Sequence, residues 1–186
     1  MNEKKSSPFT HLFNYGAICG LVMFTITILL WSLNIFPLGT AGFYFSWIPL
    51  VFMYLATKTM RDNYFKGPMS YWGAFKAQML VISSYAILYS LLLYVFAKLI
   101  YTDMVYDYVQ TYLQQLQMAR SEMLKVVGKS FANNEDQMID EIRKSTLSSI
   151  LFKEYFNKLA GAAFFALLFS IKLKRINPVS HVESKS

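Results

Sequence analysis

The stretch LFKEYFNKLAGAAFFALLFSIKLKR, residues 151–175, has a long apolar core with charged residues at both ends. Its residues 159–171 carry no charge and are followed at once by Lys172, Lys174 and Arg175. At about 1.5 Å per residue this uncharged core is about 20 Å long, shorter than the roughly 30 Å hydrocarbon core of a bilayer. The stretch therefore predicts a membrane-spanning helix that includes residues upstream of its apolar core.

Further uncharged runs occur elsewhere in the chain. No Asp, Glu, Lys or Arg lies between Ser6 and Thr57, a distance sufficient for two passes and a turn, and a second run covers Ala77–Ala97. The chain is 55% hydrophobic with a positive mean hydropathy, which is typical of an integral membrane protein. We predict an all-α membrane protein with four transmembrane helices, at about 12–33, 42–57, 73–100 and 150–173.

Local signals predict where some of these helices bend or begin. Pro49 falls near the middle of the second span, where a proline predicts a kink. Ser70 is a predicted N-cap for a third helix that begins near Tyr71. We group residues 1–178 into a single four-span membrane domain and treat residues 179–186 as a polar tail.

Residues 102–149, between the third and fourth spans, predict an outward excursion of two amphipathic helices. In the first helix, apolar residues recur at steps of three or four: Val105, Tyr108, Val109, Tyr112, Leu116, Ala119 and Met123. Asn133 and Asn134, followed by acidic residues, predict the start of the second helix. Its apolar face is expected at Met138, Ile139, Ile142 and Thr146.

The distribution of charge predicts the orientation. The N-terminal tail, the loop between the second and third spans and the C-terminal tail together hold ten Lys or Arg and three acidic residues. The other eight basic and eight acidic residues fall between Lys98 and Lys158, so the net charge of +7 resides on one side. The positive-inside rule makes that side cytoplasmic, with both termini inside. The same distribution argues against nucleic-acid binding as the reason for the basic composition.

The residues that usually carry chemistry are sparse. The two histidines, His11 and His181, lie near opposite ends of the chain, and the single cysteine, Cys19, lies inside the first span. This pattern fits neither a catalytic triad nor a metal-ligand set, and no glycine-rich phosphate loop occurs. We therefore predict no catalytic, cofactor-binding or metal site, and a protein that is not an enzyme.

Small residues suggest close helix packing. Gly16 and Gly20 lie one turn apart in the first span, a spacing that lets two helices approach closely. We favour packing within the chain, and the alternative is a dimer. Gly161 in the fourth span is a candidate for the complementary surface.

Charged and polar residues gather at the outer ends of two spans. Lys153, Glu154, Asn157 and Lys158 share one face of the helix that leads into the fourth span, and Lys98 ends the third. We call these five residues the outer polar cluster. The interpretation that we favour is an outer interface, where these side chains reach water along their stems. The alternative is that they line an outward-facing polar pocket.

Three motifs resemble a known family: NYGAICGLVMF in the first span, MRDNYFKGPMSYWGAFKA before and within the third, and GAAFFALLFSIKLKR at the end of the fourth. With them, residues 12–175 resemble the four-pass inner-membrane family of Bacteroidota classed as domain of unknown function 4199. The resemblance implies a bacterial multi-pass protein of the cytoplasmic (inner) membrane, and it implies no activity.

Together these features predict a non-enzymatic membrane component that contacts the lipid bilayer and binds a partner. The partner would be another protein or a second copy of the chain, bound through the first span or through residues 103–146. The alternative is a small transporter or channel subunit whose pathway uses the outward-facing polar pocket.

Overall fold

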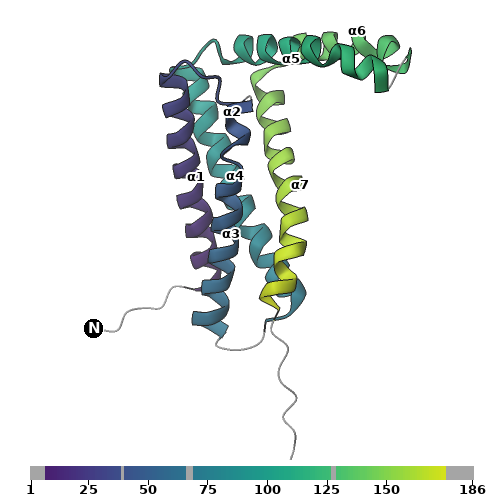
Figure 1. Cartoon of the computed structure of the whole chain (residues 1–186). Coiled ribbons are helices and arrows are strands. Elements are labelled where there is room, and N and C mark those ends of the chain that lie inside the picture. The colour runs from purple at the N-terminus through teal and green to yellow at the C-terminus, as the bar shows by residue number, and fades with distance from the viewer. Residues whose placement is uncertain (1–6, 39, 66–68, 127–128, 175–186) are drawn as a thin grey trace, which may run out of the picture. The chain divides into compact units, whose positions relative to one another are not determined.

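The computed structural model describes residues 7–38, 40–65, 69–126 and 129–174, and every regular element within them is a helix (Figure 1). The helices are α1 (Pro8–Ser32), α2 (Thr40–Phe43), α3 (Trp47–Met60), the π-helix η1 (Arg61–Phe65), α4 (Tyr71–Leu99), α5 (Met104–Val126), α6 (Lys129–Arg143) and α7 (Leu147–Leu173). The all-α fold is confirmed. The polar tail predicted at 179–186 lies outside the described residues.

Three of the described helices, α1, α4 and α7, are long and apolar enough to cross a membrane. They correspond to the first, third and fourth predicted spans. Large apolar side chains are exposed along all three helices, and in water such surfaces would favour aggregation. They include Phe13, Ile18, Leu21 and Leu29 on α1, Ile87, Leu91 and Val95 on α4, and Phe156, Phe164, Leu168 and Ile171 on α7. Contact with a lipid bilayer accounts for these exposed residues.

The predicted second span, residues 42–57, is not a single helix. α2 ends at Phe43 and α3 begins at Trp47, and a turn separates them. α3 has 14 residues, so it is about 21 Å long. Pro49 is the third residue of α3, where its missing N–H costs nothing because the first turn has no internal partner for that group. The predicted mid-helix kink at Pro49 was therefore wrong.

Capping hydrogen bonds explain where α4 and α7 begin. The Ser70 hydroxyl accepts a hydrogen bond from the N–H of Gly73 at 3.0 Å, which confirms the predicted N-cap. At α7 the cap is reciprocal. Thr146 Oγ1 accepts from the Ser149 N–H at 3.3 Å, and Ser149 Oγ accepts from the Thr146 N–H at 2.9 Å.

The start of α6 was predicted incorrectly. α6 begins at Lys129, four residues before the predicted N-cap at Asn133. An asparagine inside a helix costs only a fraction of a kcal/mol, roughly 0.7 at most, so its capping preference does not force a helix to start there.

The chain forms two compact units, each assembled from separate segments. The first unit comprises the described residues within 1–22, 47–88 and 156–186, and the second comprises those within 23–46 and 89–155. The long helices α1, α4 and α7 each contribute residues to both units.

In the first unit, α1 and α4 approach closely at a glycine. A Cβ atom on Gly16 would lie 2.6 Å from the Cβ of Ser84, and it would also overlap the carbonyl oxygen of Val81. One turn later, a Cβ on Gly20 would make an ordinary contact with Leu88 at 3.4 Å. α1 and α4 can approach this closely only because Gly16 has no side chain.

Polar groups connect the other helices of the first unit. Gln78 Nε2, on α4, donates to Ser170 Oγ, on α7, at 2.9 Å, and both side chains are buried. Arg61, in η1, forms an ion pair with Asp62 at 2.8 Å and donates to the carbonyl of Leu173 at 3.4 Å. A cation at the C-terminus of α7 satisfies an otherwise unpaired carbonyl and complements the helix dipole.

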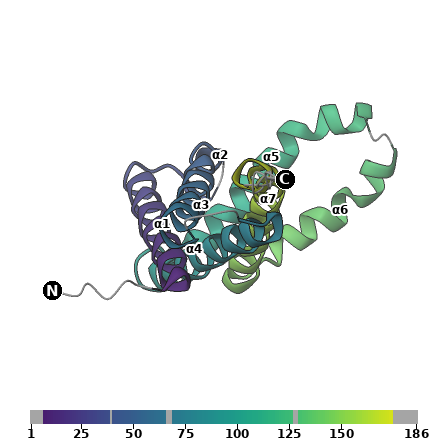
Figure 2. The ribbon, with the colours of Figure 1, turned by 90° about the horizontal axis from the view of Figure 1, so that it is seen from below.

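The second unit contains an aromatic cluster and the α5–α6 hairpin. Phe24 and Trp31 of α1 meet Phe96 of α4 edge to face, with ring centroids 5.8 and 5.3 Å apart. Figure 2 shows α5 running outward and α6 returning to the start of α7. Two helices therefore lie between α4 and α7 in the sequence, and the prediction that they form an outward excursion from a membrane stays a prediction.

Candidate functional site

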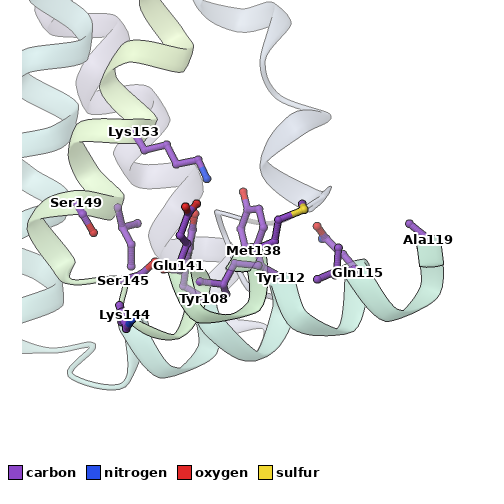
Figure 3. Close-up of a pocket in the computed structure, with 13 residues that line it drawn as sticks. Tyr108, Tyr112, Gln115, Ala119, Met138, Glu141, Lys144, Ser145, Ser149 and Lys153 are labelled. Atoms are coloured by element: carbon purple, nitrogen blue, oxygen red, sulfur yellow. Dashed lines mark hydrogen bonds between the residues drawn. The ribbon is translucent and has the colours of Figure 1, made fainter. Parts of the chain in front are cut away.

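A cavity of about 680 Å³ lies between α5, α6 and the first turns of α7 (Figure 3). We call it the hairpin cavity. All of its lining residues belong to the second unit. They are Tyr108, Tyr112, Gln115, Leu116, Ala119, Met138, Glu141, Ile142, Lys144, Ser145, Ser149, Ile150 and Lys153.

The apolar lining comes from the amphipathic faces of the two hairpin helices. On α5, Tyr108, Tyr112 and Leu116 are four residues apart and therefore share one face, which includes part of the predicted stripe. Met138 and Ile142 supply the same spacing on α6. The cavity is thus lined by apolar residues whose periodicity is visible in the sequence.

Two tyrosines form the aromatic part of the wall. The ring centroids of Tyr108 and Tyr112 are 4.3 Å apart and the rings are tilted by 32°. Burial raises the pKa of Tyr108, and the neighbouring Tyr112 and the charge of Glu154 raise it further. A tyrosine is protonated at neutral pH even without this shift, so the Tyr108 phenol is available there as a hydrogen-bond donor.

Lys153 brings a positive charge to the cavity from α7. Its Nζ lies 5.7 Å from the centroid of the Tyr112 ring, within the range of a cation–π interaction. Figure 3 shows the Lys153 side chain extending from α7 toward the cavity, with Tyr112 approaching from α5. The contact links the start of a span-capable helix to the hairpin.

Besides Lys153, the polar lining residues are Gln115 on α5 and a group from α6, the connection after it and the start of α7. Lys144 pairs with Asp140 at 3.8 Å, but both side chains are exposed, so this pair contributes little stability. Glu141, Ser145 and Ser149 complete the polar lining. Among the residues that the structure describes, no group of three or more His, Cys, Asp or Glu side chains could hold a metal ion.

The structure brings only part of the outer polar cluster to this site. Lys153 lines the cavity and Glu154 influences Tyr108, one of its lining residues. Lys98 is exposed at the end of α4, Asn157 is exposed and Lys158 is half-buried, and none of these three lines the cavity.

The candidate packing glycines have different surroundings. Gly16 and Gly20 face α4, as described above. A Cβ on Gly161 would meet no heavy atom of the described chain within 4 Å, and the residue is exposed. The structure therefore does not bring Gly161 against the glycines of α1.

The sequence did not identify Gln115, Glu141, Lys144, Ser145 or Ser149 as parts of a site. The position of Ser149 at a helix start could have been predicted, since Thr146 and Ser149 have the three-residue spacing of a reciprocal N-cap. The other four are ordinary polar residues, and only the pairing of α5 with α6 makes them neighbours of one cavity.

A family model described as "Protein of unknown function (DUF4199)" matches residues 14–175. The chain belongs to this family. The DUF4199 region extends from α1 to beyond the end of α7, and it includes every residue that lines the hairpin cavity. This confirms the family resemblance seen in the sequence motifs. No curated protein and no solved structure gives a significant match to this DUF4199 chain.

Proposed function

We propose that this DUF4199 protein is a non-enzymatic, multi-pass membrane component that binds an apolar segment of a partner protein in the hairpin cavity. The observation that carries the proposal is the composition of the cavity. Tyrosine, methionine and aliphatic side chains supply its apolar lining, and Gln115, Glu141, Ser149 and Lys153 add polar groups. Protein–protein interfaces have this organisation, with an apolar centre enriched in Tyr and Met and a polar rim.

The character of the hairpin supports an occupant that arrives from water. α5 and α6 are not among the described helices that are long and apolar enough to cross a membrane. On α5, Gln110, Gln114 and Gln117 are exposed away from the apolar stripe. A volume of about 680 Å³ is within the roughly 300–1,000 Å³ of typical binding sites, so it can hold several apolar side chains of a partner.

We further propose four passes, with residues 40–60 forming the second one. α3 alone is short for the roughly 30 Å hydrocarbon core, so the proposed pass also includes the residues before it in the sequence, from Thr40 on. Val51 and Leu55 expose apolar side chains on α3, as expected beside lipid. Tyr44 and Trp47 are exposed near its start, where aromatic residues favour the membrane interface.

The proposed orientation follows from the charge distribution. Ten basic and three acidic residues fall on the side that includes both tails, whereas the segment containing the hairpin is neutral. We therefore propose cytoplasmic termini and a hairpin on the outer side of the bacterial inner membrane.

Site-specific photocrosslinking tests the binding proposal. A photoreactive residue at Met138, inside the cavity, should give one discrete protein adduct in native membranes. The same residue at Met118, which is exposed on α5 and does not line the cavity, is the matched control. Ala119→Phe, which fills the cavity, should abolish the adduct from Met138.

The size of the adduct separates two kinds of partner. An adduct of twice the 21.5 kDa chain mass identifies a second copy of the chain and contradicts a separate partner. Equal adducts from Met138 and Met118, or no adduct from Met138, would refute the proposed site.

A buried polar pair favours a second candidate, a small transporter or channel subunit. Gln78 and Ser170 lie within two span-capable helices, and Gln78 Oε1 is buried without a hydrogen-bond partner among the described residues. An unpaired acceptor between two span-capable helices could bind water or a solute in transit. Solute flux into liposomes that contain the purified protein alone, lost in a folded Gln78→Leu variant, would support this candidate over partner binding.

A further inference from the structure

A second cavity, of about 350 Å³, lies in the same unit on a different face of α5. The end of α1, the loop after it and the start of α5 form its walls. We call it the α1–α5 cavity. It shares no residue with the hairpin cavity, and its lining residues are Trp31, Asn34, Ile35, Phe36, Tyr101, Asp107, Gln110, Thr111 and Gln114.

One wall is aromatic and held in place by packing. The Trp31 ring meets Phe96 edge to face at 5.3 Å and lies 6.0 Å from Tyr101. Phe36 packs against Tyr108 at 6.4 Å. Because these contacts restrain Trp31 and Phe36, the wall presents a preformed apolar surface to a ligand.

The polar part of the lining comes from one face of α5. Asp107, Gln110, Thr111 and Gln114 follow the i, i+3, i+4 and i+7 spacing of α5. Tyr101 donates a hydrogen bond to the Asp107 carboxylate, which fixes the orientation of that group. The wall is therefore partly preorganised for hydrogen bonding.

The end of α1 contributes a further amide. Asn34 has a left-handed backbone, with φ of 57°, and its N–H donates to the Trp31 carbonyl at 2.9 Å. Asparagine tolerates this conformation better than most residues. This hydrogen bond restrains the backbone of Asn34, which lines the cavity together with Trp31.

We infer that the α1–α5 cavity binds an uncharged saccharide unit. The amides of Asn34, Gln110 and Gln114 and the Thr111 hydroxyl each donate and accept hydrogen bonds, as sugar hydroxyls do. The C–H faces of a sugar ring fit the flat aromatic wall. No cation is among the lining residues and Asp107 is acidic, so the site disfavours an anion.

A quaternary ammonium ion is the main competing ligand, because it would suit the aromatic rings and Asp107. Such an ion cannot hydrogen-bond, so it would cover the amides of Gln110 and Gln114 and leave them without partners. Covering polar groups without replacing their hydrogen bonds weakens binding. The polar lining residues therefore favour a saccharide over a quaternary ammonium ion.

Tryptophan fluorescence tests this inference on the full chain. Trp47 and Trp72 are exposed and can be replaced by phenylalanine, which leaves Trp31 as the single reporter. The probes are glucose, galactose, N-acetylglucosamine and their β(1→4)-linked disaccharides, with tetramethylammonium as the cation probe. We expect a saturable change in Trp31 emission with at least one saccharide.

Substitutions at exposed glutamines test whether the saccharide that changes Trp31 emission binds in the α1–α5 cavity. Gln110→Ala and Gln114→Ala should each weaken saccharide binding by roughly threefold to tenfold, as expected for one lost hydrogen bond. Gln117→Ala, an exposed glutamine on the same helix outside the cavity, should leave affinity unchanged. Circular dichroism verifies that all three variants keep their helix content.

Three results would overturn the inference. They are the absence of a saturable response to every saccharide, a response to tetramethylammonium alone, and an equal loss of affinity in the Gln117→Ala and Gln110→Ala variants. Because the two cavities share no residue, this test is independent of the photocrosslinking test of the hairpin cavity.

Discussion

Replacing Gly16 by alanine should destabilise the protein, whereas the same change at Gly161 should not. A methyl group on Gly16 would overlap the backbone oxygen of Val81 and lie 2.6 Å from Ser84 Cβ. A backbone carbonyl cannot rotate away, so α1 and α4 must separate. Overpacking of this kind costs about 1–3 kcal/mol, and the backbone contact puts the cost in the upper part of that range.

The comparison with Gly161 isolates this packing cost. Gly161 lies inside α7 with open space around it, so its alanine variant gains only helix propensity, about 0.5–1 kcal/mol. Gly16→Ala gains the same amount and also pays the steric cost. The free energies of unfolding of the two variants should therefore differ by about 2–3 kcal/mol. Gly20→Ala, whose nearest contacts are at 3.4 Å, should resemble Gly161→Ala.

Reversible unfolding by sodium dodecyl sulfate in mixed micelles, followed by circular dichroism, measures these differences. Gly16→Ala should unfold at a lower fraction of sodium dodecyl sulfate than the wild type. Gly20→Ala and Gly161→Ala should unfold at the wild-type fraction or above it. If Gly16→Ala and Gly161→Ala change the unfolding free energy equally, close packing of α1 on α4 at Gly16 is refuted.

Three further predictions concern the topology, a helix cap and a tyrosine. On a Cys19→Ala background, an impermeant thiol reagent applied to intact cells should label a cysteine at position 133 and not one at 185; the reverse pattern would contradict cytoplasmic termini. Thr146→Ala should lower the unfolding free energy by about 1 kcal/mol through loss of the reciprocal cap, and Ser148→Ala, exposed in the same turn, should have little effect. Burial, together with Asp107, raises the pKa of Tyr101, so the folded state holds the phenolic proton more tightly than the unfolded chain. This stability is present below about pH 10 and is lost as the pH rises above it, so Tyr101→Phe should flatten the alkaline decline measured by chemical unfolding.

The spans that the sequence located well are those with continuous apolar composition. α1, α4 and α7 lie close to their predicted ranges because a helix in lipid must be apolar over its whole length. Ser70 marked the start of α4 because a capping hydroxyl acts only on its own helix. Such local interactions can be read from neighbouring residues alone.

The remaining features depend on contacts between elements. The break before α3 could not be located, because Pro49 is compatible both with a kink and with a first turn. The role of Gly16 was foreseeable, but not the identity of its neighbours on α4. The apolar lining of the hairpin cavity followed from periodicity, whereas Glu141 and Ser145 became lining residues only through the pairing of α5 and α6. The orientation in the membrane stays a prediction.

The continuous helix α7 contains both a part of the cavity wall and a long uncharged core. Its first turns provide Ser149, Ile150 and Lys153 to the wall of the hairpin cavity, and its uncharged core begins at Leu159. The 27 residues of α7 correspond to about 40 Å of helix, and none of them is a proline. An occupant of the hairpin cavity would therefore contact the first two turns of α7 directly, through Ser149, Ile150 and Lys153.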